Sequence, residues 1–309
     1  MYFLITTLNR HLIILAGPTA VGKTTLSIQL AKHYGCPIIS ADSRQFYKEM
    51  SIGTAKPTIE EMEGVTHYFI NNKSIDDVYN IGEYEKEAIA LIETLYLKHD
   101  ILILVGGSGL YINAILNGLD EFEEIPADIR ESLTKQYAEK GISFLQEELK
   151  QRDLNYYQEV DIHNPQRMMR ALEVCIYKGK PFSEYRTKHK KIRNFHAIPI
   201  LLNTSRTALY ERINLRVDKM IANGLVEEVK TLHSKKDLNA LNTVGYKELF
   251  SYFENNLSLE EAIQLIKQNS RRYAKRQITW FNHQGDFETF EPTDIEKIKS
   301  YISIITEHN

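Results

Sequence analysis

Eight residues near the amino terminus have the types and spacing of a phosphate-binding loop. They are Gly17, Pro18, Thr19, Ala20, Val21, Gly22, Lys23 and Thr24, a G-x-x-x-x-G-K-T pattern between an apolar run and a helix-like stretch. The glycines let backbone N–H groups converge on an anion, and the helix adds the positive end of its dipole. Lys23 adds a full positive charge, and the Thr24 hydroxyl can contact Mg²⁺. The loop predicts binding of a di- or triphosphate, as in nucleotide- and ATP-binding proteins, without saying which one.

An aspartate, Asp42, stands where a predicted strand ends. A carboxylate beside a phosphate site is a reasonable general base. The alternative is that Asp42 caps the following turn together with Ser43, and position alone favours neither interpretation. Proteins that hydrolyse nucleotides at a phosphate-binding loop (P-loop) usually have an acidic residue directly after a later aliphatic strand. Here the aliphatic run at residues 101–105 is followed by two glycines instead. That difference argues against a motor or switch ATPase.

Two arginines, Arg167 and Arg170, stand one turn apart on a predicted helix. Such a pair suits contacts with RNA phosphates, and a solvated helix face is the alternative. Residues 167–193 contain nine basic residues against two acids, a local excess of seven positive charges. The nine are Arg167, Arg170, Lys178, Lys180, Arg186, Lys188, Lys190, Lys191 and Arg193. Because the whole chain has a net charge of −3, this local excess favours an anionic partner for the segment.

Further cations follow in the last third of the chain. Arg216 can complete a diphosphate site, or it can pair on a helix surface with Asp218 or Glu211. A long predicted helix near the end carries cations that we expect to face an anion and aromatic residues that we expect to pack. The cations are Arg272, Lys275 and Arg276, and the aromatic residues are Tyr273, Trp280 and Phe281.

Strand and helix patterns alternate through the first third of the chain. The predicted strands lie at residues 12–16, 37–41 and 101–105, and the predicted helices at residues 23–33 and 81–97. Continuous apolar strands separated by helices predict an α/β fold, with a P-loop-type parallel sheet covered by helices on both faces. Ligands bind such sheets beyond the carboxyl ends of the strands, where we expect Thr24, Asp42 and Ser108 to lie.

Strand patterns stop between about residues 120 and 195. Helices are predicted there at residues 126–141, 142–151 and 164–178, followed by a basic loop at 179–193. A strand at residues 198–202 precedes helices at 206–223, 225–233, 243–253 and 259–281, the last beginning with a capping box of Ser258 and Glu261. We therefore predict a core domain of residues 1–119 and 196–309, interrupted by an all-helical insertion domain of residues 120–195.

The composition of the chain is that of a soluble globular protein. It has 309 residues, of which 43% are hydrophobic and 26% charged. The two cysteines, Cys36 and Cys175, stand far apart among apolar neighbours, so we expect buried packing residues rather than a disulfide or a zinc site. No apolar run approaches the roughly 20 residues that span a bilayer, and we expect a cytoplasmic enzyme.

Seven motifs, taken in order, resemble those of the bacterial tRNA dimethylallyltransferases. They lie at residues 17–25, 42–45, 53–57, 106–111, 166–170, 244–248 and 274–281. The match spans residues 12 to about 283, and the set is far more specific than the phosphate loop alone. The chain departs from the family pattern at Ser108, where threonine is usual, but the hydroxyl is retained. It also ends without the Cys/His finger that some eukaryotic relatives add.

The resemblance implies transfer of a dimethylallyl group from dimethylallyl diphosphate to N6 of adenosine 37 of tRNA. It implies that Asp42 is the general base, and that Arg216 holds the diphosphate together with Lys23 and the rest of the loop. It implies Mg²⁺ as the cofactor, no membrane and no obligate protein partner, and we expect a monomer. The residues implied to contact tRNA are Asp42, Ser43, Arg44, Gln45, Ser108, Arg130, Gln166, Arg167, Met168, Met169 and Arg170.

Three other functions share part of this pattern. An isopentenyltransferase acting on free adenine nucleotide would use the same loop and Asp42, but it needs no extended basic surface. A small-metabolite kinase explains the loop but not the motifs after residue 106. An RNA-binding NTPase adaptor is the third, and ATP turnover without substrate would distinguish it.

Overall fold

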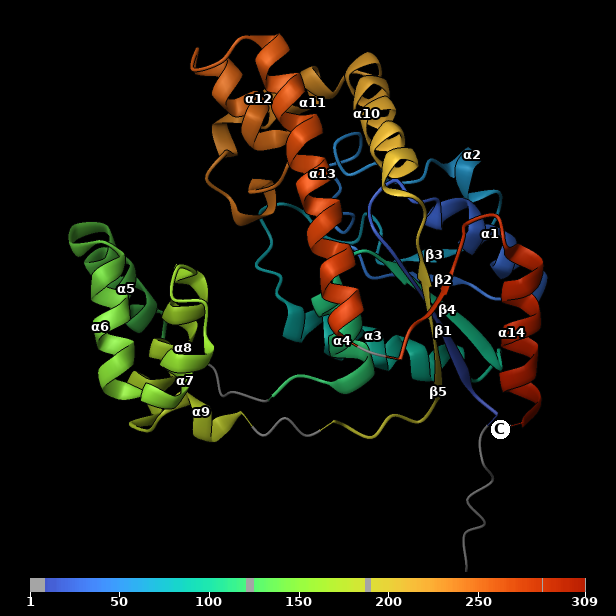
Figure 1. The fold of residues 1–309 in the computed structure, drawn as a ribbon, viewed down its shortest axis with the longest axis horizontal. Helices are drawn as coiled ribbons and strands as arrows, with labels where there is room; N and C mark the ends of the chain where they lie inside the picture. The colour runs from blue at the N-terminus through green and yellow to red at the C-terminus, as the bar shows by residue number, and fades with distance from the viewer. Residues whose placement is uncertain (1–8, 121–124, 187–189, 285, 309) are drawn as a thin grey trace, which may run out of the picture. The chain divides into compact units, whose positions relative to one another are not determined.

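The computed structural model describes residues 9–120, 125–186, 190–284 and 286–308, and within these ranges six strands form one parallel sheet (Figure 1). The strand order is β3-β2-β4-β1-β5-β6, which places β1 between β4 and β5. The strands are β1 (His11–Ala16), β2 (Ile38–Ser40), β3 (His67–Tyr68), β4 (Ile101–Gly106), β5 (His196–Leu202) and β6 (Glu288–Phe290). The predicted P-loop-type parallel sheet is confirmed.

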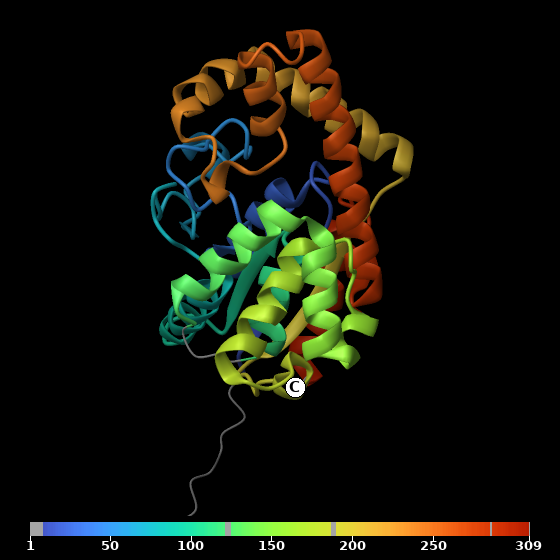
Figure 2. The same cartoon turned by 90° about the vertical axis from the view of Figure 1, so that its left-hand side faces the viewer.

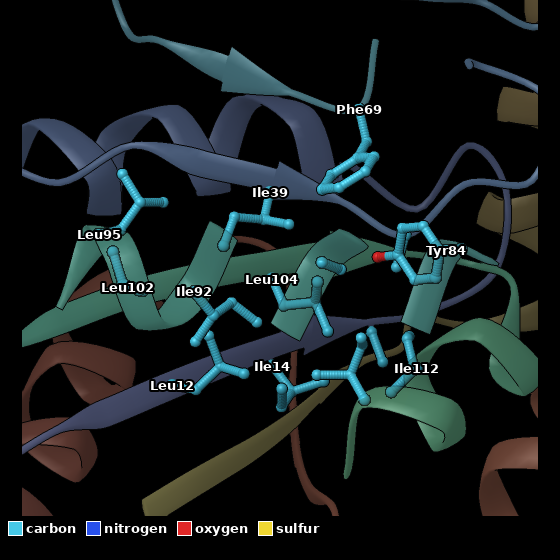
Figure 3. Packing of buried hydrophobic residues seen from close by; sticks show 14 of the residues in the cluster. Leu12, Ile14, Ile39, Phe69, Tyr84, Ile92, Leu95, Leu102, Leu104 and Ile112 are labelled. Carbon is cyan, nitrogen blue, oxygen red and sulfur yellow. The ribbon is translucent and has the colours of Figure 1, made fainter. Parts of the chain in front are cut away.

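Both faces of the sheet are buried, as the continuous apolar strands predict. Successive side chains of a strand point to opposite faces, so Leu12 and Ile14 enter one hydrophobic cluster while Ile13 and Leu15 enter another. Figure 3 shows the first cluster, where Leu12 and Ile14 lie close to Leu104 of β4. Helices α3 (Ile81–Leu95) and α4 (Gly109–Asn117) supply further members of this cluster. Helices α1 (Lys23–Tyr34), α10 (Arg206–Ala222) and α14 (Ile295–His308) supply members of the second.

A group of helices beyond β5 builds a separate cluster of buried side chains. It comprises part of α10 with α11 (Leu225–Thr231), α12 (Tyr246–Phe253) and α13 (Leu259–His283), joined by the short turns η1 (His233–Lys235) and η2 (Asn239–Leu241). Figures 1 and 2 both show α11 and α12 beside the first half of α13. The loop after β2 adds Tyr47 and Met50 to this cluster. The predicted capping box is confirmed, since Ser258 and Glu261 exchange hydrogen bonds at the start of α13.

Several elements were not predicted, and most of them are short. They are α2 (Ile59–Met62), α4, α7 (Leu154–Glu159), α9 (Phe182–Tyr185), α14, β3 and β6. Strands of two or three residues carry too few side chains to show a period, and β3 and β6 form by pairing with β2 and β5. The structure also places α9 inside the segment that was predicted as a basic loop.

The described chain divides into two compact units. The first contains Met1–Leu116 with Ile192–Asn309, and the second contains Asn117–Lys191. All regular elements among the described residues of the second unit are helices, namely α5 (Ala127–Lys140), α6 (Ile142–Arg152), α7, α8 (Pro165–Lys178) and α9. Leu133, Leu149 and Leu172 lie in its own hydrophobic core. The second unit begins three residues earlier, and ends four residues earlier, than the insertion that was predicted at residues 120–195.

Candidate active site

The phosphate-binding loop joins β1 to α1, in the strand–loop–helix setting that the sequence predicts. Lys23 Nζ donates hydrogen bonds to the carbonyl oxygens of Gly17 at 2.9 Å and Pro18 at 2.8 Å. The lysine is thus folded back over the loop. The side chain of Val21 packs in the core, while Thr19, Gly22 and Thr24 line a cavity. The loop therefore presents backbone groups, one ammonium and one hydroxyl to a ligand.

Two cavities meet near this loop. The smaller has a volume of about 280 Å³ and the larger about 450 Å³. Thr19, Asp42, Arg216 and Tyr273 line both. The smaller is otherwise lined by Ala20, Gly22, Lys23, Thr24, Gln45, Ala55, Gly107, Arg212 and Gln277. The larger also has an apolar side, formed by Ile213, Val217, Met220, Leu225, Val244 and Ile266.

The ammonium of Lys23 lies in an environment that disfavours its charge. Withdrawal from solvent lowers the pKa of Lys23 to about 7, and the nearby positive charge of Arg216 acts in the same direction. The carboxylate of Asp42 opposes both effects. Burial also lowers the pKa of Arg216, although a guanidinium remains charged. Two basic side chains held together beside a single carboxylate mark a site for an anion.

Asp42 lies just beyond the carboxyl end of β2, as predicted. One of its carboxylate oxygens, Oδ1, accepts the backbone N–H of Arg44 at 2.9 Å, so Asp42 does cap the following turn. The same side chain also lines both cavities. Because a carboxylate has about four acceptor positions, the capping bond leaves Asp42 able to accept a proton from a ligand. The two interpretations of Asp42 are therefore compatible.

The residues after Asp42 are tied to the loop that follows β4. Ser108 Oγ accepts the backbone N–H of Ser43 at 3.2 Å and lies 3.3 Å from Ser43 Oγ. Arg44 lines the larger cavity, and its guanidinium lies 3.4 Å from the carbonyl oxygen of Asn242. Gln45 lines the smaller cavity. The structure thus brings these predicted residues together at one edge of the sheet.

Helix α10 directs two arginines toward the site. Arg216 lines both cavities, whereas Asp218 pairs with Lys267 at 2.6 Å, so the predicted alternative of an Arg216–Asp218 pair is not formed. Arg212, one turn earlier, lines the smaller cavity and donates to the carbonyl of Val21 at 3.1 Å. Arg212 is not among the predicted site residues, although its spacing of four residues from Arg216 places both on one helix face.

Helix α13 contributes two residues to the site that differ from their predicted roles. Tyr273, expected to pack, is 37% exposed and lines both cavities, and burial of its hydroxyl raises the pKa of Tyr273 to about 12. Gln277 was given no role, yet it is only 7% exposed and links the phosphate loop to the loop after β4. Of the predicted anion-facing cations on this helix, Arg276 lines the larger cavity and the other two line neither. Phe281 packs as predicted.

The second unit aligns several of the predicted tRNA-contacting residues around one buried acid. The Glu173 side chain is 3% exposed and pairs with Arg130 at 2.7 Å and with Arg170 at 3.1 Å. Arg130 also donates to the amide oxygen of Gln166 at 3.2 Å. Both arginines remain about half exposed. Glu173 thus holds two guanidinium groups side by side at the surface of this unit. Its position in the sequence predicts no such role.

Three expectations for the basic segment at residues 167–193 are either wrong or concern a residue that the structure does not describe. Met168 and Met169 are 0% and 4% exposed in the core of the second unit, so their side chains pack rather than contact RNA. Arg193 belongs to the first unit, where it pairs with Glu85 at 2.8 Å and donates to two backbone carbonyls. It is therefore a structural cation. Lys188 lies outside the described residues.

Comparisons with known proteins identify the family of this chain. A family model described as IPP transferase matches residues 45–284. A tRNA dimethylallyltransferase of Christiangramia forsetii is 51% identical over 284 residues, covering 92% of this chain and 94% of the relative. The crystal structure of a tRNA isopentenylpyrophosphate transferase from Bacillus halodurans is 36% identical, with a TM-score of 0.72 over 97% of each chain. A eukaryotic dimethylallyltransferase acting on tRNA reaches a TM-score of 0.79 at 26% identity, covering 96% of this chain and 77% of that one. Since both the family model and these relatives match most of its length, the chain belongs to the IPP transferase family.

Proposed function

We propose that this protein transfers a dimethylallyl group from dimethylallyl diphosphate to N6 of adenosine 37 of tRNA, releasing diphosphate. The observation that carries the proposal is that Lys23, Arg216 and Asp42 line one cavity at the end of the sheet. Two cations beside a carboxylate supply what the reaction requires, namely a site for an anionic leaving group and an acceptor for a proton.

The phosphate loop binds the leaving group. As the bond between the prenyl carbon and the diphosphate oxygen breaks, the electron pair leaves with the diphosphate, and negative charge grows there. The N–H groups of the loop, Lys23 and Arg216 stabilise that charge, because they are held in place before the reaction. The depressed pKa of Lys23 describes the ligand-free site, and a bound diphosphate raises it again.

Asp42 acts as the general base. The exocyclic amine of adenine is a poor nucleophile because its lone pair is delocalised into the ring. As N6 forms its bond to the prenyl carbon, the amine loses a proton, and Asp42 accepts it. The hydrogen bond from Arg44 N–H to Oδ1 fixes the orientation of the carboxylate.

The larger cavity suits the organic parts of the two substrates. It adjoins the phosphate site at Asp42 and Arg216, and its apolar side offers contacts for a five-carbon chain. Adenosine 37 is stacked in the anticodon loop, so the base must turn out of the stack to reach a cavity. We assign residues 42–45 with Ser108, in the first unit, and the surface cations Arg130 and Arg170, in the second, to contacts with tRNA.

The smaller cavity suits a Mg²⁺ ion that binds together with the diphosphate. No cluster of three or more His, Cys, Asp or Glu side chains in the described ranges is placed to hold a metal by itself. Mg²⁺ at phosphate loops needs only one or two protein oxygens, because phosphate oxygens and waters complete its coordination. Thr24 and Asp42 both line this cavity, and we assign the Thr24 hydroxyl to the metal. When bound, Mg²⁺ neutralises charge on the diphosphate.

We propose that the reaction takes place in the cytoplasm and that the protein works as a monomer. Among the helices of the described residues, none has the length and apolar character needed to cross a membrane.

Mass analysis of tRNA after incubation with the protein, Mg²⁺ and dimethylallyl diphosphate tests the assignment directly. The expected product carries one dimethylallyl group on adenosine 37, and transfer proceeds without ATP. A parallel reaction with free adenosine monophosphate addresses the first rival function. Prenylation of the nucleotide but not of tRNA, or strict dependence on ATP, would overturn the proposal.

A further inference from the structure

A carboxylate from α11, Glu228, is held by three successive backbone N–H groups of the loop at residues 51–55. Glu228 Oε2 accepts from Ser51 at 3.0 Å and Ile52 at 2.7 Å, and Oε1 accepts from Gly53 at 2.9 Å. Successive N–H groups that converge in this way form a concave anion-binding site. Here the anion is a side chain of the protein, so these contacts attach the loop to α11.

A second side chain holds the same loop from α12. The hydroxyl of the fully buried Tyr246 donates to Glu228 Oε1 at 2.7 Å. Its ring lies against Gly53 so closely that a Cβ atom there would come within 2.5 Å of the ring. Only glycine fits at this contact. The motifs at residues 53–57 and 244–248, which stand far apart in the sequence, are thus two sides of one contact.

The loop held by Glu228 forms part of the walls of both cavities. Gly53 and Thr54 line the larger cavity, and Ala55 lines the smaller. Ala55 has a φ of 44°, a left-handed conformation that a residue with a side chain adopts only when its surroundings impose it. Glu228 holds Ser51, Ile52 and Gly53, the three residues that precede Thr54 and Ala55 in this loop.

The carbonyl of Thr54 connects this loop to two residues of the active site. It lies 3.5 Å from the guanidinium of Arg216 and 3.3 Å from the side-chain nitrogen of Gln45. A carbonyl oxygen beside Arg216 offers an acceptor that orients the guanidinium. The position of Thr54 in turn depends on the adjacent residues that Glu228 holds.

We propose that Glu228 is a positioning residue, which holds residues 51–55 so that the Thr54 carbonyl directs Arg216 toward the diphosphate. The proposal rests on the proposed function for the assignment of the diphosphate site. It gives α11 and α12 a role in donor binding, although the phosphate loop lies on another part of the chain. A merely structural Glu228 would instead support the loop without any specific relation to Arg216.

The test measures binding of inorganic pyrophosphate to the full chain by calorimetry, without tRNA. Glu228→Gln keeps the shape of the side chain but places an amide NH₂ among N–H donors, and we expect pyrophosphate affinity to fall by about tenfold. In an Arg216→Ala background, the same substitution should have almost no further effect, because the group through which it acts is gone. Such non-additivity is the signature of a positioning role.

A matched control stands next to Glu228 on the same helix. Glu227 is exposed, so Glu227→Gln makes the same change of charge and should leave pyrophosphate affinity unchanged. Tyr246→Phe removes only the hydroxyl bond to Glu228, and a weakening of about threefold is expected. This variant decides the question if Glu228→Gln fails to fold.

Three outcomes would overturn the inference. Wild-type affinity in both Glu228→Gln and Tyr246→Phe would show that the loop does not act on the diphosphate site. An equal fold-change in affinity in the wild-type and Arg216→Ala backgrounds would leave Glu228 with a structural role only. Absence of pyrophosphate binding by the wild-type protein would overturn the diphosphate site itself, and this inference with it.

Discussion

The side-chain amide oxygen of Gln277, in α13, accepts the backbone N–H of Thr19 in the phosphate loop at 2.9 Å. The nitrogen of the same amide donates to the carbonyl of Gly107 at 2.8 Å, and Gly107 has no room for a side chain at this contact. One amide near the end of the chain thus connects the loops that follow β1 and β4. Because both loops line the site, their spacing depends on a residue 258 positions beyond Thr19.

Gln277→Leu should lower the free energy of unfolding by about 1–3 kcal/mol, since it leaves the part-buried N–H of Thr19 and the buried carbonyl of Gly107 without their side-chain partners. It should also weaken pyrophosphate binding, because the loop carrying Thr19 loses its support. Thermal unfolding and calorimetry measure the two effects. Thr279→Ala, at an exposed position of the same helix, is the control. A variant that loses stability and retains full pyrophosphate affinity would limit Gln277 to a structural role.

Asp42→Asn should slow prenyl transfer by roughly 10²–10⁴-fold, the usual cost of removing a general base. The amide oxygen can still accept the N–H of Arg44, so the turn and both substrate affinities should be retained. Single-turnover kinetics with saturating tRNA and donor give the rate. Asp218→Asn, which changes a surface ion pair on α10, serves as the control. Near-wild-type kinetics in Asp42→Asn would remove Asp42 from the mechanism.

Diphosphate binding should be coupled to proton uptake by Lys23. The pKa of Lys23 is about 7 in the free site, and a bound diphosphate raises it, so binding above pH 7 draws a proton from solution. Affinity should therefore fall as pH rises above about 7, by up to tenfold per pH unit. Calorimetry at about pH 8, in buffers with different ionisation enthalpies, counts the protons. Identical uptake in Lys23→Gln would assign the proton to another group.

Pyrophosphate should also compete with the prenyl donor.

Replacing Arg167 and Arg170 by alanine tests the surface of the second unit. Binding of tRNA should weaken by roughly 1–3 kcal/mol for each arginine that binds the RNA strongly, and its salt dependence should fall by about one counterion per phosphate bound. Affinity for pyrophosphate should not change, since both residues lie outside the unit that carries the phosphate loop. Arg152→Ala, on α6, is a control that removes one positive charge from the same unit. Wild-type affinity and salt slope in the double variant would identify these arginines as a solvated helix face.

Met168 tests the corrected assignment of its neighbours in the second unit. Met168→Leu conserves volume and should leave both stability and tRNA affinity close to wild type. Met168→Ala leaves a cavity in the core and should destabilise this unit by about 2–5 kcal/mol. Thermal unfolding and tRNA binding at a temperature where the variant remains folded separate the two effects. A loss of tRNA affinity in Met168→Leu without a loss of stability would restore the predicted contact.

The local features of this protein could be predicted from its sequence. The phosphate loop, the buried strands at residues 12–16 and 101–105 and the capping box of Ser258 and Glu261 each depend on neighbours within a few residues. Local composition, backbone preference and hydrophobic period are enough to indicate such features. The order of its motifs also identified the family. The ends of helices and strands were predicted less accurately. The helix predicted at residues 243–253 begins at Tyr246. Short strands such as β6 form by pairing with a neighbouring strand, so their own residues do not show where they lie.

Which distant residues share the site depends on how the whole chain packs and could not be predicted from the sequence. Nothing within a few residues of Gln277 indicates a bond to Thr19, and nothing near Glu228 indicates that it holds residues 51–53. The same limit explains Met168, Met169 and Tyr273, because spacing along a helix shows which residues share a face but not what that face meets. Burial and long-range hydrogen bonds arise when separate elements pack, and so they depend on the whole fold.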